Sequence, residues 1–178
     1  MQKILLNGKA FEQLIDGQTI AERITLLARQ IDEDYQGKKP LFIVVLNGAF
    51  MFASDLIKQI QIDCEVSFVR LSSYSQMKST GTVTQLLGLQ EKLENRHVIV
   101  VEDIIDSGNT IHAIMQEMLP QNPQSLEIAT FLIKPEALQH KIKPRYSGFD
   151  IANDFVVGYG LDFDGLGRNT PHLYVLAS

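Results

Sequence analysis

The chain has 178 residues, 45% of them hydrophobic, and a formal net charge of −5 at pH 7. This length suits one domain with a sizeable core, and the acidic balance excludes the basic surface of a nonspecific nucleic-acid or anionic-membrane binder. One cysteine, Cys64, excludes an internal disulfide, and no stretch approaches the ~20 apolar residues of a membrane span. We expect a single domain over 1–178 in the cytoplasm, with no nucleic-acid or membrane partner.

Helices and strands alternate along most of the chain. Apolar residues at helical spacing predict a helix over 19–35 with Thr19 as its N-cap. Two more helices are expected over 50–60 and 109–119, the second of them stopped by Pro120. Because the connections between strands have the length of βαβ units, we expect an α/β fold with a mostly parallel twisted sheet flanked by helices. The strands are expected at 41–46, 65–71, 98–103, 126–133 and 155–159.

Three segments lie outside this alternation. Residues 72–87 are rich in Ser, Thr, Gln, Gly and Lys and predict either a long mobile loop or a weak hairpin. Long irregular segments of compact domains are commonly functional lids. The two chain ends, before Pro40 and after about Phe149, are expected to form a small hood. The core would then span about 40–150, completed by the strand at 155–159.

The stretch 98–110 is the most informative part of the sequence. Its unbroken β-branched run predicts a strand buried on both faces, which ends in the adjacent carboxylates Glu102 and Asp103. The turn at 106–110 then opens a helix, and free backbone N–H groups at a helix N-terminus can hold an anion. Ligands of open α/β sheets bind at the carboxyl ends of strands, so this stretch predicts a binding site.

Four interpretations of this stretch are open at this point. Strand-end acids followed by Asp-Ser-Gly are explained by turn and N-cap chemistry alone. A Walker phosphate loop or a dinucleotide loop would need glycine patterns that the sequence lacks. A phosphoaspartate receiver is a third interpretation, although here the acids and the anion-binding turn are contiguous. In the fourth, vicinal hydroxyls of a sugar donate to Glu102 and Asp103 while the turn binds its phosphate, which predicts a ribose 5-phosphate site.

The segment 100–110, Val-Val-Glu-Asp-Ile-Ile-Asp-Ser-Gly-Asn-Thr, resembles the phosphoribosyl pyrophosphate (PRPP) motif of the type I phosphoribosyltransferases. It is most similar to the form found in hypoxanthine (hypoxanthine-guanine) phosphoribosyltransferases. The resemblance implies transfer of the 5-phosphoribosyl group from PRPP to N9 of hypoxanthine, and of guanine, with Mg²⁺ as cofactor, in a homodimer or homotetramer. It covers most of the chain through matches at 46–49, 73–74, 79–81, Lys134, 155–159, 161–162 and Arg168.

The resemblance assigns roles within the acidic strand end and the turn. Glu102 and Asp103 would hold the ribose 2′ and 3′ hydroxyls, directly or through Mg²⁺. Asp162 is expected near a second Mg²⁺ and the pyrophosphate. Asp106 would face purine N7 as general base or acid. The 5′-phosphate would contact Asp106, Ser107, Gly108, Asn109 and Thr110.

Other residues would bind the purine and the pyrophosphate. Lys134 would donate to the purine 6-oxo group, which selects against adenine, although a lone lysine is commonly just solvated. Phe155 would stack on the purine ring and Val156 would offer backbone groups to the base edge, although an aromatic at a strand start is commonly core. The purine site would also include Asp162, the pyrophosphate site would comprise Asn47, Gly48 and Arg168, and Ser73 and Tyr74 would belong to a lid.

The expected pyrophosphate loop departs from the family pattern at Asn47. Many relatives have lysine or arginine there, so backbone N–H groups of Asn47 and Gly48 would have to bind more of the pyrophosphate. In the family, a cis peptide is often found at the bond equivalent to Leu46–Asn47. Two alternatives to the implied activity stay open: a related transferase that prefers xanthine, and a regulator that binds PRPP without catalysis.

Overall fold

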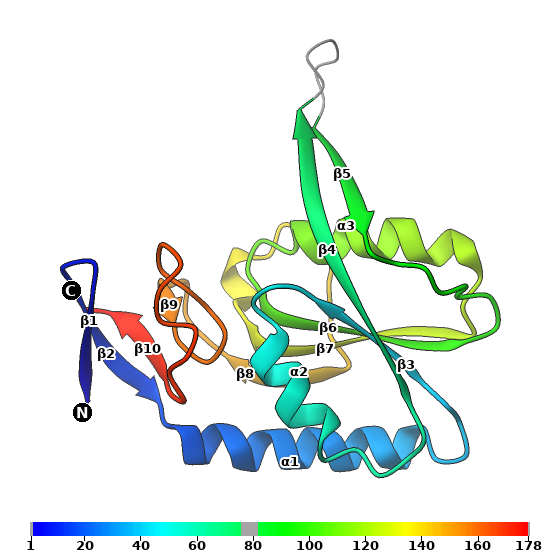
Figure 1. Ribbon diagram of the computed structural model, residues 1–178, viewed down its shortest axis with the longest axis horizontal. Coiled ribbons are helices and arrows are strands. Elements are labelled where there is room, and N and C mark those ends of the chain that lie inside the picture. The colour runs from blue at the N-terminus through cyan, green and yellow to red at the C-terminus, as the bar shows by residue number, and fades with distance from the viewer. Residues whose placement is uncertain (1, 76–81, 178) are drawn as a thin grey trace.

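Residues 2–75 and 82–177 are described by the computed structural model, which contains two β-sheets and three α-helices. The larger sheet has the strand order β5 (Thr82–Leu87), β4 (Glu65–Ser75), β3 (Leu41–Val45), β6 (His97–Ile105), β7 (Ser125–Ile133) and β8 (Tyr146–Asp150), and the helices are α1 (Gly17–Asp34), α2 (Phe50–Ile57) and α3 (Asn109–Met118). Five of these strands are parallel, and β5 pairs antiparallel with β4. Figure 1 shows the sheet between α1 on one side and α3 on the other. Within the described residues, no helix is both long and apolar enough to cross a membrane.

The central strand β6 is buried on both faces, as its sequence predicts. Val98 and Val100 pack in the cluster that contains α3. Ile99 and Val101 alternate with them and pack in the cluster that contains α1 and α2. All four side chains are 0% exposed, and full burial of a branched apolar side chain contributes about 1.5–3 kcal/mol. The strand is therefore a firm support for the residues at its carboxyl end.

Helix α1 begins two residues earlier than expected. Asp16 is the N-cap rather than Thr19, because its Oδ1 accepts a hydrogen bond from the Thr19 N–H at 2.9 Å. The Gly17 N–H donates to Nδ1 of His172 at 2.7 Å, which ties the start of the helix to the C-terminal segment. The expected apolar stripe is confirmed, since the buried side chains include those of Ile20, Ile24, Leu27 and Ile31.

The segment 72–87 forms a hairpin over its described residues. Strand β4 continues to Ser75 and pairs with β5 (Figure 1), so the expectation of a long loop is wrong there and the expectation of a hairpin is confirmed. Ser73 and Tyr74, which we expect in a lid, lie in the β4 strand of this hairpin. The matched residues 79–81 lie outside the described residues. The lid itself stays a prediction.

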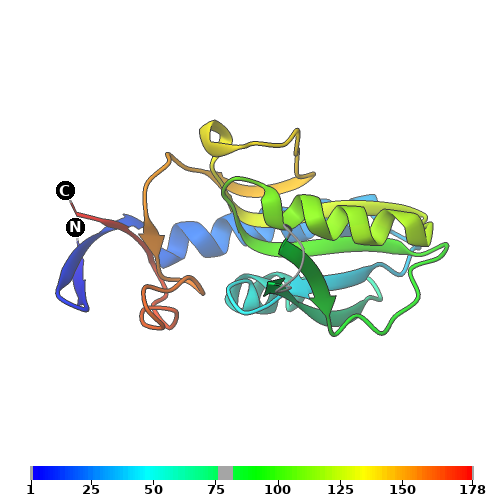
Figure 2. The ribbon, with the colours of Figure 1, turned by 90° about the horizontal axis from the view of Figure 1, so that it is seen from above.

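The two chain ends meet in a second, antiparallel sheet, which is the expected hood. Its strands in spatial order are β1 (Lys3–Leu6), β2 (Lys9–Ile15), β10 (Leu173–Leu176) and β9 (Val156–Val157), and Figure 2 shows them beside one end of the parallel sheet. Two expectations about its limits are wrong. The strand expected at 155–159 ends early, because Gly158 and Tyr159 have φ of 104° and 48°. It pairs with β10, while Val156 and Tyr159 pack in the core cluster that contains α1 and α2. Helix α1 packs on the parallel sheet instead of belonging to the hood.

Candidate active site

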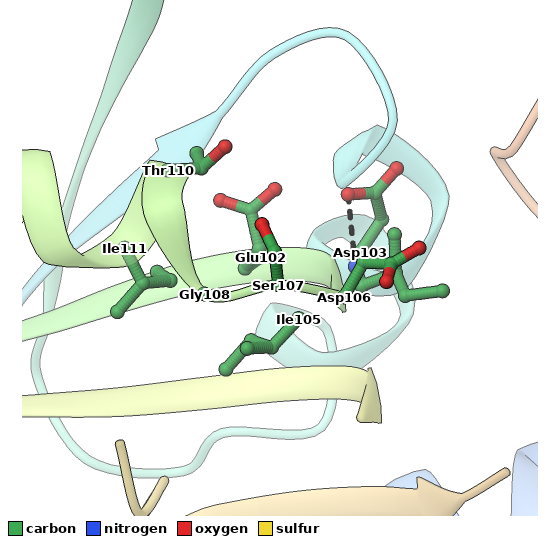
Figure 3. A pocket seen from close by; sticks show the side chains of 9 residues that line it. Glu102, Asp103, Ile105, Asp106, Ser107, Gly108, Thr110 and Ile111 are labelled. Carbon is green, nitrogen blue, oxygen red and sulfur yellow. Dashed lines mark hydrogen bonds between the residues drawn. The ribbon is translucent and has the colours of Figure 1, made fainter. Parts of the chain in front are cut away.

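The carboxyl end of β6 places two carboxylates on opposite sides of the strand. Successive side chains of a strand alternate, so Glu102 points toward α3 and Asp103 toward the loop after β3 (Figure 3). Glu102 is buried, and within the described chain its Oε2 has no hydrogen-bond partner. Burial and, second, the charge of Asp103 raise the pKa of Glu102 well above its usual value. A buried acid of this kind is stabilised by a ligand hydroxyl or a cation.

Asp103 is held against the loop after β3. Its Oδ1 accepts a hydrogen bond from the Ile104 N–H at 2.9 Å (Figure 3). A Cβ atom on Gly48 would lie only 1.5 Å from Asp103 Oδ2, so this close approach requires glycine. The neighbouring Leu46–Asn47 peptide bond is cis, as the resemblance implies. Burial also raises the pKa of Asp103, so both acids of the strand end are costly to leave charged without a partner.

The turn at 106–110 joins β6 to α3. Gly108 is the N-cap of the helix, with φ of 83°, a left-handed conformation that favours glycine. Gly108 has no side chain to cap the helix, and the Asn109 N–H makes only a long hydrogen bond of 3.4 Å to the Ser107 hydroxyl, so the first turn of α3 can offer backbone N–H groups to an anion. The turn and the acids line a pocket of about 260 Å³ (Figure 3), formed by Glu102, Asp103, Ile104, Ile105, Asp106, Ser107, Gly108, Thr110 and Ile111.

The side chain of Asn109 does not line this pocket, although we expect this residue to bind the 5′-phosphate. Its Oδ1 lies 2.7 Å from Nε2 of His140, which belongs to the segment after β7. The amide is therefore directed away from the acids. Of Asn109, only the backbone N–H, whose hydrogen bond to the Ser107 hydroxyl is a long 3.4 Å, is left to contact a phosphate at the turn.

A second pocket of about 190 Å³ adjoins the first. Both pockets are lined by Asp103, Ile104 and Asp106, so these residues stand at the boundary between them. The side chains that we expect to bind a purine are thereby gathered beside those that we expect to bind a sugar phosphate. The complete lining is Asp103, Ile104, Asp106, Lys134, Phe155, Val156, Leu161 and Asp162.

Comparison with known protein families assigns the chain to a family. The model of the phosphoribosyl transferase domain matches residues 10–164 of this chain. The chain belongs to the phosphoribosyl transferase family. The fold agrees with this assignment, since a parallel sheet of five strands flanked by helices is what the resemblance implies.

Relatives of this phosphoribosyl transferase domain cover nearly the whole chain. A hypoxanthine-guanine phosphoribosyltransferase of Mycobacterium tuberculosis is 39% identical over 97% of this chain and 89% of its own length. A hypoxanthine-guanine-xanthine phosphoribosyltransferase of Tritrichomonas foetus is 38% identical over 88% of this chain and 86% of its own. The crystal structure of a hypoxanthine-guanine phosphoribosyltransferase from Bacillus anthracis matches with a TM-score of 0.85 and 38% identity, covering 93% of this chain and 98% of that one.

In this member of the family, Lys134 is not a solvated lysine. It follows the last residue of β7, is 6% exposed, and places its Nζ 2.7 Å from Oδ2 of Asp106. The two residues expected to contact the purine 6-oxo group and N7 therefore hold each other beside the second pocket. A purine that contacts both Lys134 and Asp106 must break this ion pair.

The hood supplies an aromatic wall to the second pocket. Phe155 is 47% exposed, so it is not a core residue. Its ring is supported by Phe11 and Phe163, at centroid distances of 6.3 Å and 5.7 Å. Val156 beside it is buried and pairs with Val175 of β10, which fixes the backbone at the edge of the pocket.

The carboxylates expected near Mg²⁺ are divided between the two pockets: Glu102 lines the first, Asp103 lines both and Asp162 lines the second. Within the described residues, no group of three or more His, Cys, Asp or Glu side chains could hold a metal ion. Asp162 forms an ion pair with Arg168 and accepts a hydrogen bond from the Gly165 N–H at 2.8 Å. Arg168 also donates to the carbonyl oxygen of Gly160 at 2.7 Å. Glu102 and Asp103 are adjacent at the strand end and form one pair of carboxylates that a metal could use.

Sequence patterns missed the contacts that fix the last loop of the site. Tyr159 donates its hydroxyl to Oδ2 of Asp55 at 2.5 Å, which links the loop to α2. Burial, reinforced by Asp55, raises the pKa of Tyr159, so the hydroxyl stays a donor. A Cβ atom on Gly160 would lie 2.3 Å from the carbonyl oxygen of Gly48, so this loop packs directly on the loop after β3. In the local sequence, only the presence of glycine at position 160 indicates this close packing of the two loops.

Proposed function

We propose that this phosphoribosyl transferase catalyses the transfer of the 5-phosphoribosyl group from PRPP to N9 of hypoxanthine, and also of guanine, with release of pyrophosphate. The observation that supports this function most directly is the pair of pockets that meet at Asp103 and Asp106. One pocket offers acids and a helix N-terminus, which suit a sugar phosphate. The other offers a buried cation and a half-exposed aromatic ring, which suit a 6-oxopurine.

The sugar phosphate would occupy the first pocket. Its 2′ and 3′ hydroxyls would donate to Glu102 and Asp103, and Glu102 Oε2, which has no partner within the described chain, would gain one. The 5′-phosphate would lie at the N-terminus of α3, where it would accept hydrogen bonds from backbone N–H groups and from the hydroxyls of Ser107 and Thr110.

The residues of the strand end also fit Mg²⁺. Glu102 and Asp103 supply the carboxylate oxygens that this ion prefers, and it commonly needs only one or two of them beside water and substrate phosphates. A cation there would offset the cost of two neighbouring charged acids, whose pKa values are both raised by burial. When bound, Mg²⁺ would neutralise charge on the leaving pyrophosphate. Asp162, paired with Arg168, would act at the pyrophosphate and purine side of the site.

The purine would enter between Lys134 and Asp106. Lys134 would exchange its bond to Asp106 for one to the 6-oxo group, and Asp106 would then be free to take or give a proton at N7. A bond from N9 to C1′ forms as the bond from C1′ to pyrophosphate breaks, and the electron pair leaves with the pyrophosphate. Adenine has a 6-amino group in place of the acceptor, so it would leave the buried lysine unpaired.

The leaving pyrophosphate would lie between the loop after β3 and Arg168. Asn47 carries no charge, so the backbone N–H groups of Asn47 and Gly48 would bind the pyrophosphate together with the guanidinium of Arg168. Ser73 and Tyr74, in the β4–β5 hairpin, would form the lid that excludes water from the cation-like transition state.

One assay tests this function against both alternatives. Pyrophosphate release from PRPP is measured with hypoxanthine, guanine, xanthine and adenine, first with Mg²⁺ and then after chelation. We expect release with hypoxanthine and guanine, little with adenine, and loss of activity on chelation that added Mg²⁺ restores. Fastest turnover of xanthine would instead identify a xanthine-preferring transferase. No release with any base, together with binding of PRPP and nucleic acid, would identify a regulator.

We also propose that the chain folds as one domain over 1–178 and acts in the cytoplasm as a homodimer or homotetramer. Phe50 at the start of α2 is 44% exposed and is a candidate for a subunit interface. Phe52, another aromatic of the same helix, is 0% exposed and belongs to the core, so it cannot contribute to that interface. Light scattering of the purified protein measures the assembly, and a monomer at micromolar concentration would contradict the proposal.

A further inference from the structure

The segment after β7 contacts four consecutive residues of the turn that opens α3. This segment, residues 134–142, begins with the first residue after β7, continues through a short 3₁₀ turn, Pro135–Ala137, and lies against the N-terminus of the helix. None of these contacts uses a backbone N–H group of α3, so they hold the turn in place and leave those donors to an anion. The contacts pair Lys134 with Asp106, Gln139 N–H with the Ser107 carbonyl, Ile142 with Gly108, and His140 with Asn109.

The contact between His140 and Asn109 orients the first residue of α3. Nε2 of His140 lies 2.7 Å from Oδ1 of Asn109, and because an amide oxygen only accepts, Nε2 carries the hydrogen. Nδ2 of the same amide lies 3.5 Å from Oε1 of Gln139. Both ends of the Asn109 amide therefore face the segment 134–142, and the backbone N–H of Asn109 stays with the turn.

His140 is itself held by the helix that it supports. Its ring stacks on the ring of His112, with centroids 4.1 Å apart and planes inclined by 5°. His112 lies three residues after Asn109 on α3, and its backbone N–H donates to the carbonyl oxygen of Gly108 at 2.9 Å. His140 thus contacts both the beginning and the end of the first helical turn. Neither of the two pockets that form the site is lined by His140.

We propose that His140 is a positioning residue for the phosphate-binding turn. By donating to Asn109 and stacking on His112, it holds the first turn of α3 in the orientation in which its backbone N–H groups meet the 5′-phosphate. It acts through the turn and touches no substrate. The inference rests on the proposed function, because the anion it serves is the 5′-phosphate of PRPP.

Three variants of His140 separate its two contacts, with KM for PRPP, KM for hypoxanthine and kcat as readouts. His140→Ala should raise the KM for PRPP about fivefold, the effect of one lost hydrogen bond, and leave the KM for hypoxanthine unchanged. His140→Phe keeps a ring for His112 but no donor, so it should behave like the alanine variant. His140→Gln places an amide donor near the position of Nε2 and should restore most of the PRPP affinity.

A matched control is another half-buried histidine with one hydrogen bond. Nδ1 of His97 lies 2.7 Å from the hydroxyl of Ser125 at the opposite end of β6, so His97→Ala should leave both KM values unchanged. If the wild-type protein is active and His140→Ala leaves the KM for PRPP unchanged, the positioning role alone is overturned. Equal increases in both KM values, or a glutamine variant that gives no rescue, would overturn that role as well. An inactive wild-type protein would overturn the proposed function, and this inference with it.

Discussion

Replacing Gly48 by alanine should disable the site by displacing Asp103. The added Cβ would lie 1.5 Å from Asp103 Oδ2 and 2.4 Å from its Cγ, whereas real Cβ atoms essentially never approach another atom within 3.0 Å. The carboxylate must therefore move by about 1.5 Å, which breaks its hydrogen bond from the Ile104 N–H. Loss of a hydrogen bond to a charged group costs about 1.5–3 kcal/mol. A misplacement of about 1 Å in an active site can lower the rate by about a hundredfold.

We therefore expect Gly48→Ala to lower kcat/KM for PRPP by about a hundredfold and the free energy of unfolding by about 2 kcal/mol. Steady-state kinetics and urea denaturation measure the two effects. Gly37→Ala is the control, because it is also a glycine-to-alanine change but the added Cβ would meet no atom within 4 Å. Gly37 has a φ of 73°, so this change strains only the backbone. This control should lose about 1 kcal/mol of stability through its backbone and keep its kcat/KM. Wild-type kcat/KM in Gly48→Ala would refute the assignment of Asp103 to the reacting site.

Three further substitutions test the purine side and its anchor. Asp106→Asn should lower kcat by about a hundredfold or more with little change in the KM for PRPP, and unchanged turnover would exclude an acid–base role. Lys134→Met should raise the KM for hypoxanthine at least about tenfold and spare that for PRPP, because the 6-oxo donor is lost; equal KM changes would contradict this. Tyr159→Phe should lower the free energy of unfolding by about 1 kcal/mol in urea denaturation, since Asp55 loses its 2.5 Å hydrogen bond; an unaltered midpoint would show that the bond adds nothing.

The hood shows where sequence patterns stop being sufficient. Strand β1 has an alternating exposed and half-buried pattern, and β2 mixes buried, half-buried and exposed residues, so neither strand is buried continuously as β6 is. The early end of the strand after Phe155 depends on positive φ at Gly158 and Tyr159, which only glycine signals in a sequence. Asp16 and Thr19 are both residue types that cap helices, and in the structure Asp16 is the N-cap of α1. The next residue, Gly17, is hydrogen-bonded to His172 of the C-terminal segment, a contact that the local sequence does not predict.

By itself, the sequence determined the central strand and the chemistry at its end. A continuous β-branched run is stable only when both faces are buried, so the burial of β6 followed from composition alone. The acids at 102–103 and the turn at 106–110 are contiguous with that strand, and strand geometry therefore places them at one edge of the sheet. The motif could be interpreted because its parts are neighbours in the chain.

Only the tertiary structure decided which distant side chains meet. Lys134 pairs with Asp106 across 28 positions of sequence, and His140 with Asn109 across 31. The ion pair between Arg168 and Asp162 likewise joins two residues that we expected at the pyrophosphate. Periodicity describes neighbours two to four residues apart, whereas these contacts depend on the order of strands in the sheet and on the paths of the loops that join them.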